Sequence, residues 1–204
     1  MISNKINAAL KGSPKIPGDK SISHRSIIIP SISKGVCEVT NILKSDDVTN
    51  TLEAFKAMGV NITEQNEKII IYGKGLNSLK KPTKEIYLGN SGTSARLLTG
   101  LLSSQSFNSK LIGDKSLSSR PMKRISDPLR KMNAEIYDNN GKLPLEIRGK
   151  ELLSTSIDIK IPSAQIKSGI ILAALNTSGT TEIIENYVSR DHTEIMLQSF
   201  EADI

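Results

Sequence analysis

The chain has 204 residues, of which 37% are hydrophobic and 24% charged, and its formal net charge is +6. This composition predicts a soluble globular protein, because no apolar run comes near the roughly 20 residues that a bilayer-spanning helix needs. The single cysteine, Cys37, excludes an intrachain disulfide and a cysteine-based zinc site, and the first residues lead into no apolar signal core, so we expect a cytoplasmic protein with no membrane partner. The positive charge suits an anionic partner, but 3% aromatic residues and scattered lysines argue against nucleic acid.

The first predicted element is a helix over residues 21–31, and a polar motif leads into it. The sequence PGDKSISHR, at residues 17–25, begins with a turn and then places Lys20, Ser21 and Arg25 within one or two helical turns. Backbone N–H groups at a helix start, hydroxyls and cations together form a good binding site for a phosphate or a carboxylate. We therefore expect an anion site at the start of this helix.

The elements after this helix recur along the chain, which indicates an internal repeat. Each unit contains a helix, a strand, a second, amphipathic helix and two further strands. The three units cover approximately residues 15–80, 81–150 and 151–204, the last of them truncated. The fold class is therefore predicted to be α/β or α+β. The first helices are predicted at 21–31, 91–102 and 164–175, the second helices near 47–58, 124–132 and 191–200, and the strands between them at 36–40, 109–112 and 180–184.

The ends of the repeated units carry further predictions. Gly59 and Asn133 suit the left-handed conformation that closes a helix, whereas Glu201, at the matching place in the third unit, does not. The first two units close with a strand pair, but the chain ends at Ile204 before the third pair begins. We expect the chain to be a fragment or to be completed by another polypeptide; a domain with a naturally short last repeat is the alternative.

The first helices of the three units begin in similar polar sequences, at residues 20–25, 90–96 and 163–168. In a symmetric arrangement of repeats these helix starts face a common centre, where three positive helix ends would hold a polyanionic ligand. The alternative is that Ser, Thr and Asn cap each helix without any ligand. Arg120 is a further candidate cation, and Pro121 after it suits the first turn of a helix.

The histidines and the cysteine are not assigned to chemistry. The positions of His24 and His192 do not identify either residue as part of a Ser–His–Asp triad. We expect both to stabilise the structure or to support residues that contact the ligand. Asp191 is expected to cap the helix that follows it. Cys37 alternates with apolar residues and is predicted to lie in the core.

Six motifs in this order resemble those of the 5-enolpyruvylshikimate-3-phosphate (EPSP) synthase family. They are PGDKSISHR (17–25), SDDV (45–48), GNSGTSARL (89–97), SRPM (119–122), SAQIKS (163–168) and SRDHTE (189–194). The resemblance runs from about Ile16 to Ile204, and the first and last motifs are similar to those of the bacterial class that includes glyphosate-tolerant members.

The resemblance implies an enolpyruvyl transferase fold of two domains, with the substrates in the cleft between them. Each domain has three copies of a unit of two helices and a four-stranded mixed sheet. Residues 15–204 would form the N-terminal domain with its third unit truncated, residues 1–14 would pack with the second domain, and that C-terminal domain would be absent.

The reaction implied is transfer of the enolpyruvyl group from phosphoenolpyruvate to the 5-hydroxyl of shikimate 3-phosphate, a step of chorismate and aromatic amino acid biosynthesis. No metal or organic cofactor is expected, and glyphosate is the expected inhibitor. Lys20 would be the catalytic residue and would contact both substrates. The resemblance places Ser21, Arg25, Ser163, Ala164, Gln165 and Arg190 at shikimate 3-phosphate, and Gly92 and Arg120, with Gln165 nearby, at phosphoenolpyruvate. Thr93 is a further expected substrate-binding residue.

The family's acid–base Asp and Glu, a second Lys and further arginines would lie in the absent half, so we expect the chain to fold without catalysing the reaction. The full-length enzyme is expected to be glyphosate-sensitive, because Gly92 stands where tolerant members carry Ala. A phosphate-binding, non-catalytic domain is one alternative. UDP-N-acetylglucosamine enolpyruvyl transferase is another, although it typically has Lys-Asn where this chain has Lys20-Ser21, and a loop cysteine unlike Cys37.

Overall fold

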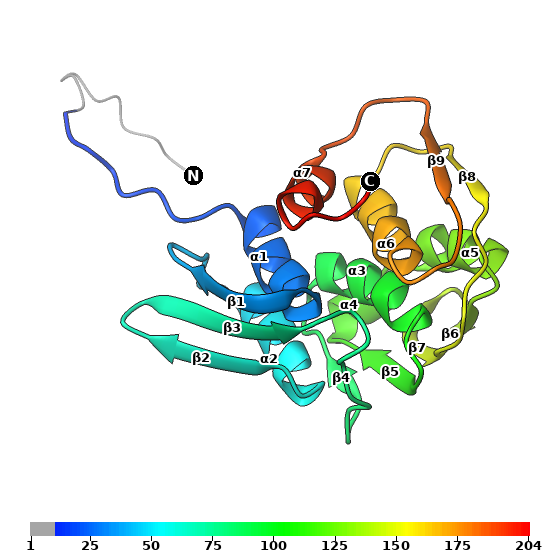
Figure 1. Ribbon diagram of the computed structural model, residues 1–204, viewed down its shortest axis with the longest axis horizontal. Coiled ribbons are helices and arrows are strands. Elements are labelled where there is room, and N and C mark those ends of the chain that lie inside the picture. The colour runs from blue at the N-terminus through cyan, green and yellow to red at the C-terminus, as the bar shows by residue number, and fades with distance from the viewer. Residues whose placement is uncertain (1–10) are drawn as a thin grey trace, which may run out of the picture.

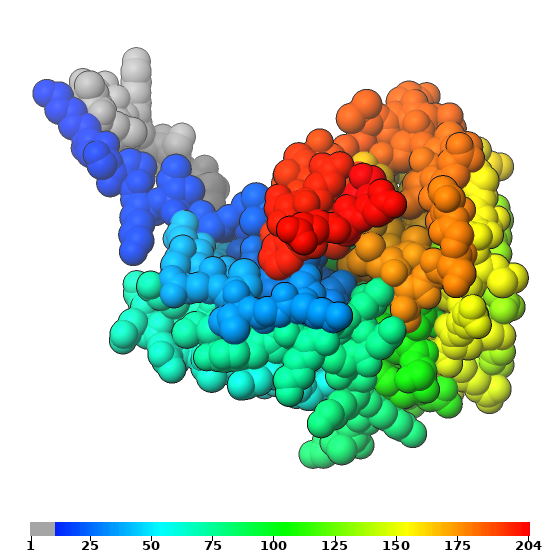
Figure 2. Space-filling model, viewed as in Figure 1, coloured from blue at the N-terminus to red at the C-terminus, as the bar shows by residue number. Residues whose placement is uncertain are grey.

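The computed structural model describes residues 11–204. The prediction for the leading segment 1–14 falls mostly on residues 1–10, which lie outside the described residues. Residues 11–17 are an exposed coil that projects from the body of the molecule (Figures 1 and 2). None of the helices in the described part has the length and the apolar character needed to cross a bilayer.

Helices and strands alternate along the chain (Figure 1). In chain order they are α1 (Lys20–Ile32), β1 (Lys34–Val39), α2 (Asp46–Ala57), β2 (Asn61–Gln65), β3 (Lys68–Lys74), β4 (Ile86–Tyr87), α3 (Gly92–Ser103), β5 (Asn108–Ile112), α4 (Lys115–Ser119), α5 (Lys123–Lys131), β6 (Glu135–Asn139), β7 (Lys142–Arg148), β8 (Ser156–Ile159), α6 (Ala164–Ala174), β9 (Glu182–Glu185) and α7 (His192–Ser199). The mixed α/β fold class is confirmed, and so are the three pairs of helices.

The strands form three sheets, one for each predicted unit. The first has the order β1-β3-β2 and is antiparallel, the second is mixed with the order β4-β5-β7-β6, and the third pairs β8 with β9 in parallel. The sequence analysis missed β4 and β8, which precede the first helix of their units. β4 has only two residues, too few to show an alternating pattern, and its pairing with β5 is a contact between distant parts of the chain.

The three first helices begin within about one residue of their predicted starts, and each start is capped by a side chain. Oxygens of Asp19, Ser91 and Ser163 accept hydrogen bonds from the backbone N–H three residues later, at 2.8, 3.1 and 3.4 Å. These bonds satisfy one of the open donors in each first turn and leave the others pointing out of the helix end.

The second helices end alike. Gly59, Asn133 and Glu201 all adopt the left-handed conformation, with φ of 83°, 70° and 61°. In each case the next residue donates its backbone N–H to a carbonyl five residues earlier, at 3.0–3.1 Å. The prediction for Glu201 is wrong because the apolar residue after it, Ala202, packs against Leu197 and its neighbours, so tertiary packing overrides the local preference.

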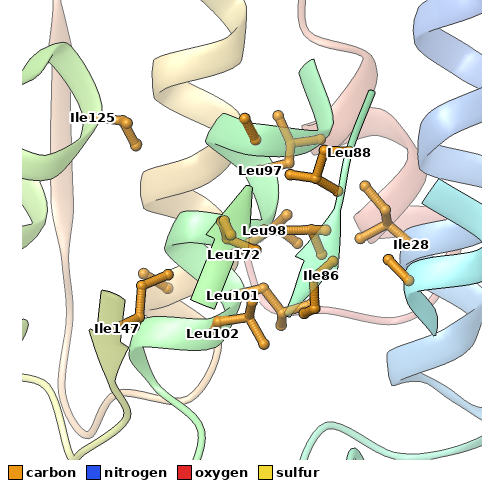
Figure 3. Close-up of a cluster of buried hydrophobic side chains, with 14 of the residues drawn as sticks. Ile28, Ile86, Leu88, Leu97, Leu98, Leu101, Leu102, Ile125, Ile147 and Leu172 are labelled. Atoms are coloured by element: carbon orange, nitrogen blue, oxygen red, sulfur yellow. The ribbon is translucent and has the colours of Figure 1, made fainter. Parts of the chain in front are cut away.

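The core is centred on α3, whose leucines are fully buried between β4 and α6 (Figure 3). The backbones of α3 and α6 touch at two glycines. A Cβ at Gly100 would overlap the carbonyl oxygen of Gly169, and one at Gly169 would lie 2.7 Å from the carbonyl oxygen of Arg96. Only glycine permits this approach, which brings the starts of the two helices together.

Two local predictions are wrong. Cys37 is half-buried rather than part of the core, because β1 is an edge strand that is covered weakly. Pro121 opens no helix: it is exposed between α4 and α5. Met122 after it is fully buried and donates its N–H to the carbonyl of Gly141 at 2.7 Å, so the helix begins at Lys123.

Candidate functional site

The N-terminal ends of four helices surround a small pocket. The starts of α1 and α6 lie at the same end of the molecule, next to α7 (Figure 1), and α3 packs against α6. The pocket is lined by Ser21, Arg25, Thr93, Ala164, Gln165, Arg190 and His192. All of these except His192 are residues that the sequence analysis assigned to substrate binding. Helix starts from the first, second and third units thus meet at one place.

Arg25 is the buried cation of this pocket, with 3% of its surface exposed. Its guanidinium donates to the hydroxyls of Thr193 at 2.6 Å and Ser168 at 2.7 Å, and to the carbonyl of Ser21 at 2.9 Å. Burial lowers the pKa of Arg25, but an arginine remains charged at neutral pH. All three acceptors are neutral, so the positive charge is not cancelled by its own hydrogen-bond partners.

Two hydroxyl residues behind Arg25 were missed as functional residues. Ser168 and Thr193 lie 2.6 Å apart, oxygen to oxygen, and Ser168 also donates to the carbonyl of Ala164 at 2.6 Å. Both residues stand in motifs quoted above, but their sequence positions give no sign that they meet the same arginine. Together they fix the guanidinium of Arg25 at the pocket.

Gln165 links the pocket to the start of α3. Its side-chain amide donates to the hydroxyl of Thr93 at 3.1 Å, and its oxygen accepts from Arg96 at 3.1 Å. Arg96 also donates to the carbonyl of Gly92 at 3.0 Å. The orientation of Gln165 is therefore set by a donor and an acceptor that both come from α3.

A cluster of arginines lies over Gly92. A Cβ at Gly92 would be 2.7 Å from Arg96 Nη1 and 3.1 Å from Arg120 Nη1. Arg120 also donates to the side chain of Asn90. Burial, and then the charges of Arg120 and Arg124, lower the pKa of Arg96. Like charges held close together favour an anion between them. Arg96 lies within the polar helix start 90–96 that the sequence analysis singled out, but it was not assigned a substrate contact.

The structure does not bring every expected residue into the pocket. Lys20 forms an ion pair with Asp47 of α2, and its side chain is half exposed. Arg120 belongs to the cluster over Gly92, and Ser163 caps α6. Lys167, the cation within the polar sequence 163–168, turns instead toward Glu185 and Glu194.

His24 is fully buried beside the site. Its Nδ1 lies 2.8 Å from Thr51 Oγ1 and 3.3 Å from Ser94 Oγ. Burial, reinforced by the charge of Lys20, lowers the pKa of His24 to about 4, so the ring is neutral at pH 7. The hydrogen bonds join α1, α2 and α3, which agrees with the structural role expected for His24.

His192 and Asp191 stand at the start of α7. His192 lines the pocket, and its Nδ1 is buried with no hydrogen-bond partner among the described residues. Asp191 occupies the N-cap position, but its side chain makes no capping hydrogen bond, so the expected cap is not formed by the carboxylate. His192 is thus a pocket residue that the sequence analysis did not assign to binding.

Comparison with known proteins identifies the family of this chain. The sequence matches the family described as EPSP synthase (3-phosphoshikimate 1-carboxyvinyltransferase) over residues 4–204. A 3-phosphoshikimate 1-carboxyvinyltransferase of Ruthia magnifica is 51% identical over 96% of this chain and 45% of its own length, and one of Oceanobacillus iheyensis is 49% identical over 98% and 47%.

Solved structures agree with the sequence matches. An EPSP synthase from Acinetobacter baumannii superimposes with a TM-score of 0.90 at 47% identity, over 96% of this chain and 45% of that one. The chain spans about half the length of the curated relatives it matches. By sequence and by structure, the chain belongs to the EPSP synthase family.

Proposed function

We propose that this chain is the phosphate-binding half of an enzyme that transfers the enolpyruvyl group of phosphoenolpyruvate to the 5-hydroxyl of shikimate 3-phosphate. The observation that carries the proposal is the pocket in which a buried arginine, whose hydrogen-bond acceptors are all neutral, and open helix starts converge. In the reaction the 5-hydroxyl loses its proton to a base as its oxygen bonds to C2 of phosphoenolpyruvate, while C3 gains a proton from an acid. The tetrahedral intermediate then loses a proton from C3 and phosphate from C2, which restores the double bond.

Shikimate 3-phosphate would occupy the pocket itself. Arg25 and Arg190 would pair with its phosphate, and the hydroxyl of Ser21 would donate to it, since charge-assisted hydrogen bonds contribute about 1.5–3 kcal/mol each. Ser163, Ala164 and Gln165 at the start of α6 would supply a hydroxyl, backbone N–H groups and an amide. These groups are already held in place, so little ordering would be needed on binding.

Phosphoenolpyruvate would bind beside it, over Gly92. Arg120, supported by Arg96, would offset the charge of its phosphate, and Thr93 and Gln165 would lie between the two substrates. Lys20 would serve both substrates after exchanging its partner Asp47 for an anionic ligand. Holding two anions together against their repulsion is the chief task of such a site, and fixed cations do it. No metal or organic cofactor is part of the proposal.

Glyphosate would compete for the space over Gly92. A methyl group there would press on the guanidiniums of Arg96 and Arg120, so the glycine of this chain suits a glyphosate-sensitive enzyme. A cytoplasmic location remains a prediction from the sequence.

Calorimetric titration of the 204-residue chain with shikimate 3-phosphate tests the proposal. We expect measurable but weak binding, and no phosphate release when both substrates are present, because the acid–base groups are expected in a C-terminal half. Robust turnover by the chain alone would refute the half-enzyme part of the proposal. Absence of any binding would favour a scaffold, and preference for a UDP-sugar would favour the related transferase.

A further inference from the structure

Behind the pocket, one lysine lies between two glutamates. Lys167 Nζ is 2.8 Å from Glu185 Oε2 and 2.7 Å from Glu194 Oε1, and the lysine side chain is only 11% exposed. Hydrogen bonds and charge from both glutamates raise the pKa of Lys167 against the effect of burial. The three groups form a compact ion triad that the proposed reaction does not use directly.

The triad joins α6 to both ends of the segment that carries Arg190. Glu185 is the last residue of β9, and Glu194 lies in the first turn of α7, so residues 186–191 run between the two carboxylates. Within this segment, Ser189 donates its hydroxyl to Glu185 Oε1 at 2.7 Å. One lysine of α6 thus fixes where the segment begins and where it ends.

The segment has little other support. Tyr187 and Val188 are 67% and 101% exposed, so its own apolar side chains do not anchor it. Asn186 makes one long hydrogen bond, 3.4 Å, to Asp158. Arg190 is exposed and reaches the pocket through a single 3.3 Å contact with the hydroxyl of Ser21. The position of Arg190 therefore depends on the two ends of the segment.

Charge gives the triad a second effect on the pocket. Among the neighbouring charges, that of Glu194 acts most strongly on the pKa of Arg25, which it raises. Glu194 also has a buried oxygen, Oε2, with no partner among the described residues. Without Lys167, two carboxylates would stand uncompensated beside a site for an anion, and both would oppose its binding.

We propose that Lys167 is a positioning residue for the phosphate-bearing substrate. Through Glu185 and Glu194 it holds the segment with Arg190 over the pocket and neutralises the acidic charge behind Arg25. This inference rests on the proposed function, because it assumes that the pocket binds shikimate 3-phosphate. It assigns Lys167 no contact with the substrate.

The first test compares two lysines that each lie between two glutamates. Lys167→Met should weaken shikimate 3-phosphate binding to the 204-residue chain about tenfold, since one charge-assisted contact and the local charge balance are lost. Lys110, on β5, contacts Glu85 at 2.8 Å and Glu146 at 3.6 Å and is the matched control. Lys110→Met should leave the affinity unchanged, and Lys167→Arg should restore most of it.

A double-mutant cycle separates positioning from general destabilisation. If Lys167 acts partly through Arg190, then Lys167→Met should weaken binding clearly less in an Arg190→Ala background than in the wild-type background, where the remaining loss reports the uncompensated charge near Arg25. Equal losses in both backgrounds would overturn the proposal, as would wild-type affinity in Lys167→Met.

Lys167→Met leaves two partly buried carboxylates without their cation and could prevent folding. Glu185→Gln is the milder variant, because it releases one end of the segment and keeps the pair of Lys167 with Glu194. We expect faster amide hydrogen exchange at residues 186–190 in this variant, measured without ligand. Exchange as slow as in the wild type would overturn the role of Lys167, whereas failure of the wild type to bind shikimate 3-phosphate would count against the proposed function instead.

Discussion

The pocket at the starts of α1 and α6 and the arginine cluster over Gly92 both hold positive charge, but they do so differently. In the pocket, Arg25 is buried and each of its acceptors is a neutral oxygen. Over Gly92, the guanidinium groups of Arg96 and Arg120 lie close together, and they fit there because the glycine has no side chain. Hydrogen bonds hold the cations of both regions, but those of Arg25 are buried, whereas the second region also depends on the space that Gly92 leaves open.

This difference predicts that mutations in the two regions act on different properties. A change in the pocket should affect both folding and binding, because the same hydroxyls serve the core and the ligand. A change over Gly92 should alter the ligand site and leave folding almost untouched.

Arg25→Ala should abolish measurable shikimate 3-phosphate binding and lower the free energy of unfolding by about 3 kcal/mol, because buried charge-assisted hydrogen bonds are lost and hydroxyls lose a partner. Urea denaturation and calorimetric titration measure the two effects. Arg190→Ala is the control: Arg190 is exposed, so binding should weaken while the unfolding free energy stays the same. Unchanged stability in Arg25→Ala would show that the pocket is not preorganised as described.

Acid should destabilise the fold through His24. The pKa of His24 is about 4 in the folded protein against 6.5 for an unperturbed histidine, so the unfolded chain binds the extra proton first as the pH falls. The neutral ring's full stability is therefore present above about pH 6.5 and is lost toward pH 4, by about 2 kcal/mol at pH 5 and about 3 kcal/mol at pH 4.

Comparison with His24→Gln separates the contribution of the histidine to the pH dependence from that of the carboxylates, which titrate in the same pH range. The difference in unfolding free energy between wild type and His24→Gln should shrink as the pH falls from 7 to 4, because only the wild type gains the protonation penalty. A difference that is constant with pH would argue against a buried neutral His24.

Gly92→Ala should leave shikimate 3-phosphate affinity within about twofold and the unfolding free energy within about 1 kcal/mol, because its methyl group meets the flexible ends of Arg96 and Arg120. In the full-length enzyme the same change should lower glyphosate sensitivity and phosphoenolpyruvate affinity. Loss of shikimate 3-phosphate binding in the 204-residue variant would mean that the two regions are not separate.

A small stability effect is expected for Lys20→Met. The ion pair of Lys20 with Asp47 is half exposed, and such pairs contribute little, so the unfolding free energy should change by less than about 1 kcal/mol. Thermal denaturation at low and high salt checks this. A large, salt-insensitive loss would place Lys20 in the folding core rather than at a ligand site.

Much of the fold was predictable from local signals. The capping residues and apolar periodicity located all three first helices, and Gly59 and Asn133 indicated where second helices end. The end of the second helix of the third unit, at Glu201, was not expected to be left-handed, because that conformation is imposed by the packing of Ala202 rather than by the residue itself. The two-residue strand β4 was missed because it exists only through its pairing with β5.

The site was predictable only in part, for the same physical reason. The start of a helix, with its unpaired backbone N–H groups, can be predicted from the local sequence. The regions that contain Ser21, Thr93 and Ala164 could therefore be found from the sequence. The direction of a long side chain cannot be read that way: Lys167 points to its glutamates and Arg96 to Gln165, across the interface of α3 and α6. The contact of Arg96 with Gln165 accompanies the close approach of Gly100 and Gly169, and the contacts of Lys167 depend on where β9 and α7 pack; no local pattern reveals either arrangement.

The most direct test is a titration of the 204-residue chain with shikimate 3-phosphate, followed by backbone amide resonances in solution. Binding at the joined helix starts predicts shifts concentrated at the first turns of α1, α3 and α6. A larger open hollow over β5 and β7, lined in part by Lys110 and Arg148, offers a competing basic surface. Shifts confined to that hollow, or no shifts at all, would contradict the account.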